Sequence, residues 1–263
     1  MNHDNCLNCN SSLQANAAYC AWCGQKTNTH RLSFHELGHD AVHYITHADK
    51  SIFNLIKELA RRPGLVAREY IAGKRQKHFK PLNFFLIVAG IVVFMTSSLY
   101  KPNDFRSQQM EQSNQQITDP VKKQYHIQMA NRVSKVNTFT GKYSNAIYMV
   151  ATPLLTFIFW LFYRKRFNYI ESLLANMYFI AFIMLLYALV FVPLQRIFPQ
   201  IGLYLVLVFF CFEVIFRGFA YNQLTGSHGT RRWIKAYGLS LLLSLIWFAL
   251  TYMLIIYYIR HGF

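Results

Sequence analysis

The sequence is poor in charge, and above all in acidic charge. Only 14% of its 263 residues are charged, and 11 acidic residues stand against 27 lysines and arginines. A soluble domain has about 25% charged residues, so this composition excludes an ordinary soluble protein. Hydrophobic residues make up 54% and aromatic residues 17% of the chain, which indicates an integral membrane protein.

The chain also lacks a disulfide framework and an apolar leader. Four of the five cysteines lie in two CxxC pairs, and the fifth, Cys211, lies inside an apolar run. Paired CxxC spacing is typical of metal sites in reducing compartments. Residues 1–30 are polar and contain no apolar segment of the secretory type, so we expect no signal peptide.

Long apolar runs lie beyond the first third of the chain. They cover residues 82–100, 144–163, 172–194, 201–216 and 237–259. Each approaches the roughly 20 residues that a helix needs to cross about 30 Å of hydrocarbon. We therefore predict an all-α polytopic membrane protein with about five transmembrane helices, a membrane domain over 82–263 and an extracytoplasmic loop over 101–143. The fourth run contains Glu213 and precedes Arg217, so a broken or tilted helix is the alternative there.

The end of the long loop predicts an amphipathic helix. Asp119 followed by Pro120 is typical of a helix start, and apolar residues recur at helical spacing from Val121 to Val136. We expect this helix to lead into the second apolar run.

Basic residues gather beside alternate ends of the apolar runs. They are dense before the first run, after the second and after the fourth, and sparse on the other side. The positive-inside rule then predicts a cytoplasmic N-terminus and an extracytoplasmic C-terminus. The net charge of +16 indicates anionic lipid headgroups as a partner, rather than nucleic acid. Six residues expected at the membrane surface are Arg61, Arg62, Lys74, Arg75, Lys77 and Lys80.

Residues 1–30 predict a zinc-ribbon knuckle. Its ligands would be the thiolates of Cys6, Cys9, Cys20 and Cys23, with ten residues between the two CxxC pairs. Each pair makes a tight turn that aims two thiolates at one ion, and Gly24 permits a positive φ there. Four sulfur ligands close a tetrahedral shell, for which zinc is the expected ion and iron the alternative. Closed ribbons commonly present a surface to a protein partner.

Residues 31–81 predict a cytoplasmic segment that begins with a stripe of histidines. His35, His39, His43 and His47 repeat every four residues and would share one face of a helix. Residues 35–39, HELGH, match the HExxH motif, in which His35 and His39 would bind zinc and Glu36 would activate water. The competing interpretation is an amphipathic helix with its histidines at a wet interface, or a metal or pH sensor.

The basic stretch that follows predicts two short helices. Apolar residues from Ile52 to Leu59 share one helical face behind Ser51, an N-cap candidate, and Pro63 with Gly64 ends that helix. A second helix would end at Gly73. We expect the resulting hairpin to lie on the inner leaflet and to lead into the first span through Pro81.

These segments together resemble a bacterial family of zinc-ribbon membrane proteins of unknown function. That family is marked by N-terminal CxxC pairs, an RPG motif, a YxxGKR motif and a proline that leads into the first span. The resemblance implies an inner-membrane location and brings no activity. A later YIESLL, with Glu171, resembles a second family element, although Ser172 stands where the family often has histidine. The positions that match the first motifs are Arg62, Pro63, Gly64, Tyr70, Gly73, Lys74, Arg75 and Pro81.

Glu213 and Arg217 are the candidates for a polar site inside the membrane. They lie one helical turn apart, so they predict a structural ion pair, or alternatively a Glu213 that couples to an ion. We favour a non-enzymatic membrane protein whose zinc ribbon and basic hairpin form a cytoplasmic interaction or regulatory platform. The alternatives are a membrane metalloprotease that uses the HELGH segment and a small ion-coupled transporter that uses Glu213. No internal repeat is visible, so a transporter would require a homo-oligomer.

Overall fold

The computed structural model describes residues 4–14, 17–27, 51–99, 119–226 and 229–261. In this part of the chain the structure is helical, and its only β pairing is two isolated bridges near the cysteines. The prediction of an all-α fold is therefore confirmed. The helices are α2 (Ser51–Arg61), α3 (Pro63–Ile71), α4 (Pro81–Leu99), α6 (Pro120–Val150), α7 (Thr152–Tyr163), α8 (Tyr169–Leu186), η1 (Tyr187–Phe191), α9 (Val192–Ile197), η2 (Pro199–Ile201), α10 (Gly202–Thr225) and α11 (Thr230–His261).

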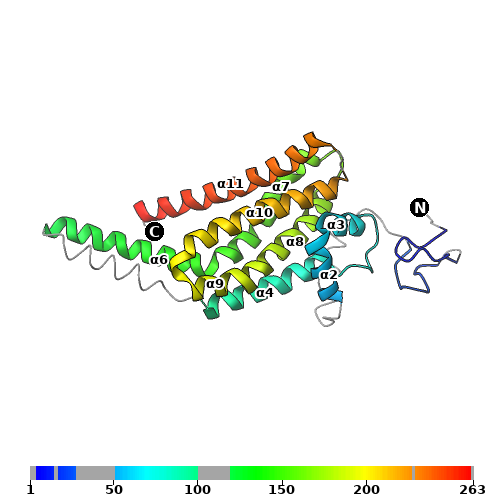
Figure 1. The fold of residues 1–263 in the computed structure, drawn as a ribbon, viewed down its shortest axis with the longest axis horizontal. Coiled ribbons are helices and arrows are strands. Elements are labelled where there is room, and N and C mark those ends of the chain that lie inside the picture. The colour runs from blue at the N-terminus through cyan, green and yellow to red at the C-terminus, as the bar shows by residue number, and fades with distance from the viewer. Residues whose placement is uncertain (1–3, 15–16, 28–50, 100–118, 227–228, 262–263) are drawn as a thin grey trace.

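Helix α8 lies at the centre of the bundle. Every residue from Ile170 to Leu185 is buried, because α4 and α7 pack along α8 and α3 also contacts it. A helix that is apolar on all sides is expected at such a position. Helices α10 and α11 pack against each other, and stacked rings of Phe182 and Phe216, with centroids 4.9 Å apart, join α8 to α10. Figure 1 shows these long helices aligned along one axis, with the knuckle at one end and the C-terminal end of α11 toward the other.

Four of the described helical segments are long and apolar enough to cross a membrane. They are Pro81–Ser98, Tyr169–Ile197, Gly202–Thr225 and Thr230–Arg260. Large apolar side chains such as Leu203 and Leu207 of α10 and Leu254 of α11 are exposed on the outside of the bundle. An apolar exterior of this kind is costly in water and favourable in hydrocarbon. These features support a multi-pass membrane protein.

The apolar run 144–163, predicted as a span, is divided between two helices. Its first part continues α6, and its second part is the 12-residue α7, with Ala151 between them. Pro153 has no N–H to donate to the preceding turn, and its ring crowds that turn, which explains the break. The predicted helix start is confirmed at α6, where the Asp119 carboxylate accepts a hydrogen bond of 2.9 Å from the Val121 N–H. The apolar side chains of its first turns, such as Val121 and Tyr125, are exposed.

The run 172–194 spans α8, η1 and the start of α9. The π-helical turn η1 directly precedes Val192 and Pro193. A widened turn relieves the contact between the proline ring and the carbonyl of the preceding turn.

The last two runs form single helices. Helix α10 continues through Glu213 and Arg217 as far as Thr225, so the alternative of a broken helix is wrong. Helix α11 contains the run 237–259 and begins earlier, at Thr230.

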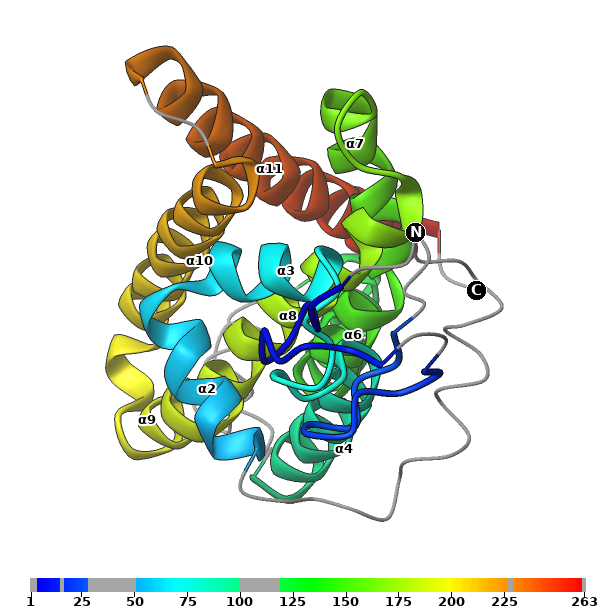
Figure 2. The same ribbon diagram turned by 90° about the vertical axis from the view of Figure 1, so that its right-hand side faces the viewer.

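The α2–α3 hairpin packs across one end of the bundle, as the view along the bundle shows (Figure 2). Helix α3 contacts α10 and α8, and the backbone N–H of Gly64 donates to the side-chain oxygen of Gln223 at 3.1 Å. A Cβ atom on Gly64 would overlap the Ala220 carbonyl oxygen and the Leu224 nitrogen. Glycine is therefore required for α3 to approach the backbone of α10 this closely.

Substituting Gly64 by alanine should destabilise the protein. We expect Gly64→Ala to lower the free energy of unfolding by about 1–3 kcal/mol, because overpacking forces α3 away from α10. The matched control is Gly90→Ala on α4, where an added Cβ meets nothing within 4 Å. Unfolding of the detergent-solubilised variants tests this, and equal stability of the two alanine variants would contradict the close approach.

Candidate functional site

The four-cysteine knuckle, defined here as residues 4–14 and 17–27, consists of two similar turns. The first turn is closed by the bridge Asn5–Ser12, and the second by the bridge Tyr19–Lys26. Asn10 has φ 63° in the first turn, and Gly24 has φ 70° in the second. The left-handed residue of the second turn was expected from its glycine. Its counterpart Asn10 was missed, although asparagine is among the residues that tolerate this conformation best.

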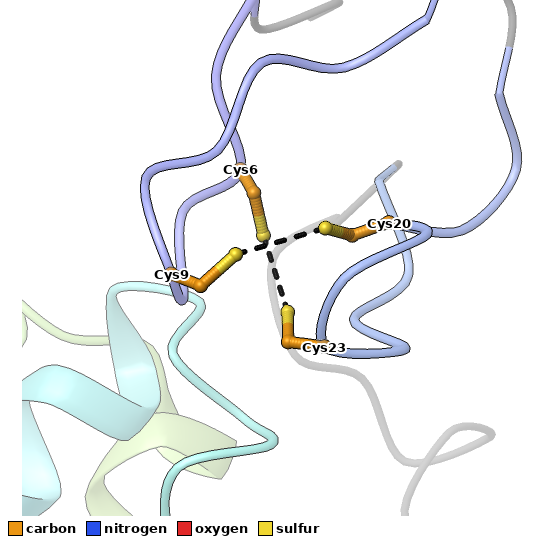
Figure 3. Close-up of side chains that lie close together, drawn as sticks. All are labelled: Cys6, Cys9, Cys20 and Cys23. Atoms are coloured by element: carbon orange, nitrogen blue, oxygen red, sulfur yellow. Dashed lines mark hydrogen bonds between the residues drawn. The ribbon is translucent and has the colours of Figure 1, made fainter.

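The thiols of these turns converge on one point (Figure 3). All four sulfur atoms lie within 4.8 Å of one another. The distance from Cys6 to Cys23 is 3.6 Å and that from Cys9 to Cys20 is 3.7 Å between sulfur atoms. Zn–S bonds of about 2.3 Å in a tetrahedron require sulfur atoms about 3.8 Å apart, so the thiols fit one tetrahedral metal ion.

Polar contacts give the thiols unequal acidities. The Ser11 hydroxyl lies 3.0 Å from the sulfur of Cys9 and 3.2 Å from that of Cys20. Hydrogen bonding with Ser11 is the main cause that lowers the pKa of Cys20, to about 6. Burial raises the pKa of Cys6 to about 11. Sequence reasoning missed Ser11, which lies between the two CxxC pairs.

The knuckle contacts the loop between α3 and α4. The buried side chain of Gln25 accepts a hydrogen bond of 3.0 Å from the backbone N–H of Gln76, and the Gln76 side chain donates to the Gly24 carbonyl at 3.4 Å. The second CxxC turn is thereby connected to the segment that directly precedes Lys77 and His78. The sequence contains no pattern that predicts this contact.

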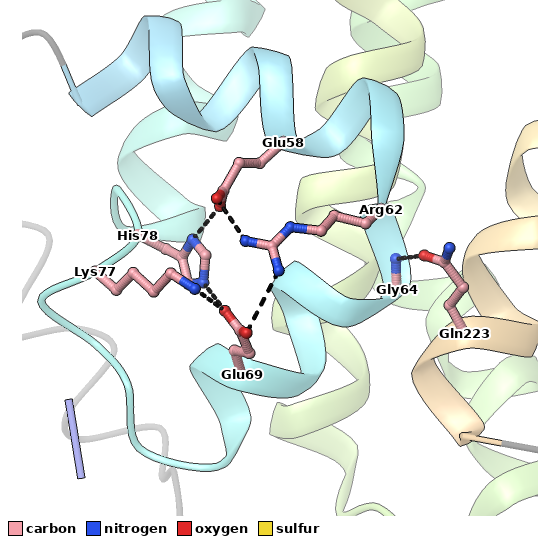
Figure 4. Close-up of polar contacts among 7 residues, drawn as sticks. All are labelled: Glu58, Arg62, Gly64, Glu69, Lys77, His78 and Gln223. Atoms are coloured by element: carbon pink, nitrogen blue, oxygen red, sulfur yellow. Dashed lines mark hydrogen bonds and ion pairs between the residues drawn. The ribbon is translucent and has the colours of Figure 1, made fainter. Parts of the chain in front are cut away.

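A cluster of charged side chains holds the α2–α3 hairpin and its following loop together (Figure 4). Arg62 pairs with Glu58 at 2.5 Å and with Glu69 at 3.6 Å, and Lys77 pairs with Glu69 at 2.7 Å. The ring of His78 lies between the two carboxylates, with Nδ1 3.1 Å from Glu58 and Nε2 2.8 Å from Glu69. We call these five residues the hairpin cluster. Sequence reasoning assigned Arg62 and Lys77 to the membrane surface and did not predict these partners.

The hairpin cluster shifts the acidities of its members. Burial raises the pKa of Glu69, but hydrogen bonds from Lys77 and His78 more than offset it and bring this pKa down from 4.5 to about 2. The charged Glu69 therefore stabilises the fold fully above about pH 4.5, and this contribution is lost as the pH falls through about 2. Burial lowers the pKa of His78, while the carboxylates of Glu69 and Glu58 oppose that shift.

This end of the molecule resembles a known protein family. Residues 49–93 match a family described as "Protein of unknown function (DUF3667)". The matched segment contains the whole hairpin cluster, the α2–α3 hairpin and the first part of α4. No curated protein and no solved structure matches the chain.

The residues of the RPG and YxxGKR motifs and Pro81 all lie in the matched segment, whereas the CxxC pairs and Glu171 lie outside it. The structure gives several of the residues within the segment a physical role. Pro63 begins α3, where its missing N–H has no cost, and Gly64 contacts α10. The buried Tyr70 lies edge-on to Tyr178 of α8, with ring centroids 5.9 Å apart. Gly73, with φ 102°, turns the chain after α3.

The candidate pair inside the membrane is buried and has a third member. Arg217 pairs with Glu213 on the same helix, and both contact the hydroxyl of Tyr148 on α6, which donates to Glu213 at 2.6 Å. Arg217 is 1% exposed and Glu213 is 5% exposed. The ring of Trp247 on α11 packs edge-on against Tyr148 at 4.9 Å, so the group joins three helices. Sequence reasoning identified the two charged residues and missed Tyr148.

Two other sequence-based hypotheses have different outcomes. His35, Glu36, His39, His43 and His47 lie outside the described residues, so the HELGH hypothesis stays a prediction. The sequence places Glu171 close to Arg164, Lys165 and Arg166, which predicts a solvated counter-charge, and that prediction is wrong. Glu171 is buried and forms a capping box with Asn168 at the start of α8, which explains the acidic residue of the YIESLL segment by helix capping.

Breaking the hairpin cluster should show coupling between its members. Glu69→Gln should destabilise the protein by about 1–3 kcal/mol, because the buried His78 and the partly exposed Lys77 lose their charged acceptor. Combined with Lys77→Gln, the cost should be smaller than the sum of the two single costs. Combined with Lys165→Gln, an exposed cation of the α7–α8 turn, the costs should add. Additive costs in both pairs, from unfolding measurements, would refute the coupling.

The pair inside the membrane should behave as one unit. Glu213→Gln leaves Arg217 buried without its counter-charge, which should cost about 3–5 kcal/mol. The double variant Glu213→Leu with Arg217→Met removes both charges and should be more stable than Glu213→Gln alone. Thermal unfolding in detergent measures these stabilities. A double variant that is less stable than Glu213→Gln would contradict a structural pair.

Proposed function

We propose that this protein is a regulatory platform of the bacterial cytoplasmic membrane, in which a metal-bound knuckle docks on the DUF3667 hairpin on the cytoplasmic side. The observation that carries this proposal is the pair of hydrogen bonds from Gln76 to Gln25 and Gly24. These hydrogen bonds connect the knuckle, whose fold would depend on the metal, to the loop between α3 and α4. That loop supplies Lys77 and His78 to the hairpin cluster. Metal occupancy would thereby control the order of that loop.

The chemistry of the donor set supports a structural ion. Four thiolates fill a tetrahedral shell and leave no open position for a substrate or an activated water. Zinc is the ion we propose, with iron as the alternative for the same ligands. A segment of this size buries too little apolar surface to fold alone, so the ion would supply its folding free energy.

The knuckle exposes two aromatic side chains that are suited to a protein partner. Trp22 is 86% exposed and Tyr19 is 60% exposed. Exposed aromatic residues of this kind often anchor protein interfaces. A partner bound there would sense whether the knuckle is metallated and docked.

Metal analysis combined with hydrogen exchange tests the proposal on the full chain. We expect about one zinc per chain in the wild type and in His39→Ala, and none in Cys20→Ser/Cys23→Ser. The backbone N–H of Gln76 should exchange faster in the cysteine variant and in Gln25→Ala, which keeps the metal but removes the acceptor. Exchange in the C-terminal part of α11, which lies toward the other end of the bundle (Figure 1), serves as the internal control.

Two outcomes would overturn this proposal. Unchanged exchange at Gln76 in the metal-free variant would show that the knuckle does not control the loop. A second metal that is lost in His39→Ala would instead favour the metalloprotease hypothesis, whose further test is proteolysis abolished by Glu36→Gln.

A further inference from the structure

A cavity of about 370 Å³ opens beside the hairpin cluster. Six of the side chains that line it are charged or titratable: Lys57, Glu58, Arg61, Arg62, Lys77 and His78. Four of these are cations and one is a carboxylate. A cavity with this lining does not suit an apolar ligand, for which mostly hydrophobic walls are expected.

Two of the cations are not committed to carboxylates of the described chain. Lys57 and Arg61 lie one turn apart on the same face of α2, and both are exposed. Neither forms an ion pair within the described residues. Their like charges repel, and a bound anion would remove that repulsion.

The other two cations retain donors that the hairpin cluster does not use. Arg62 has five N–H donors, and its carboxylate contacts involve only its two terminal nitrogens. Lys77 has three N–H donors and one carboxylate partner in the described chain, Glu69. Glu58 and Glu69 therefore hold Arg62 and Lys77 in place without exhausting their capacity to bind an anion.

We propose that this cavity is a binding site for a phosphate group, with Lys57 and Arg61 as its principal ligands and with Arg62 and Lys77 positioned by the hairpin cluster. Clustered arginine and lysine side chains are the usual ligands of phosphate oxygens. The cavity lies at the end of the bundle where α4 begins, so the phosphate could belong to a lipid headgroup or to a free phosphate compound. The proposal does not depend on metal in the knuckle.

Binding to the full-length protein in a phosphate-free detergent tests the site. The probes are inorganic phosphate, titrated by calorimetry, and phosphatidylglycerol, followed by native mass spectrometry with phosphate-free diacylglycerol as the matched lipid. The variant Lys57→Gln/Arg61→Gln spares the hairpin cluster. The control Arg164→Gln/Lys165→Gln removes the same charge from exposed positions outside the cavity lining.

We expect Lys57→Gln/Arg61→Gln to weaken phosphate-group binding at least about tenfold and the control to change it less than about twofold. Binding of inorganic phosphate that competes with the lipid assigns the site to free phosphate compounds. Binding of phosphatidylglycerol alone, without diacylglycerol binding, assigns it to headgroups. The proposal is overturned if neither probe binds, or if both double variants weaken binding equally, since that result describes a diffuse basic surface.

Discussion

The close approach of α3 to α10 at Gly64 is the constraint on which this end of the molecule depends. Backbone meets backbone there, so the position of α3 is set by hard contact and by the hydrogen bond to Gln223. With α3 fixed, Glu69 is fixed, and Glu69 in turn holds Lys77 and His78 of the following loop. The docking of the knuckle on Gln76 rests on that loop. A hairpin that only lay on the bilayer surface would not fix the position of this loop, and the knuckle could not dock on it in one defined way.

Because acidic residues are few, most of the described carboxylates are engaged in specific contacts within the fold. Among the described carboxylates, Glu58 and Glu69 pair within the hairpin cluster, Glu171 caps α8, and Glu213 pairs with Arg217. Each of these carboxylates is half-buried or buried and stabilises a particular contact. Few are left to neutralise exposed cations such as Lys57 and Arg61. The excess of positive charge is therefore concentrated where an external anion would be the counter-charge.

Sequence reasoning succeeded where a feature is local. The apolar runs, the CxxC pairs, the helix start at Asp119 and the positive φ of Gly24 all follow from neighbouring residues. The break at Pro153, which divides an apolar run between α6 and α7, is also a local effect, because a proline has no N–H to donate to the preceding turn.

Contacts between distant segments could not be predicted from periodicity or composition. Glu69 lies within a basic stretch whose charge suggested only a lipid surface, and His78 gave no indication of two carboxylate partners. Tyr148 is one of 17 tyrosines, and nothing in its sequence neighbourhood distinguishes it as the partner of Glu213. Such pairs become visible only when the helices are packed, because their separation along the chain is set by topology and not by helical repeat.

The extent of the family match adds a functional argument. The match covers residues 49–93, which include the α2–α3 hairpin, the hairpin cluster and the start of α4, and it includes neither the four cysteines nor Glu213. A structural role accounts for Gly64, Tyr70 and the buried apolar side chains of α2, α3 and α4, which pack in the core of the bundle. The same segment also contains a cavity lined with cations, two of which, Lys57 and Arg61, form no ion pair in the described chain. Uncompensated like charges one helical turn apart destabilise a helix, so the placement of Lys57 and Arg61 beside a cavity is better explained by a ligand than by packing.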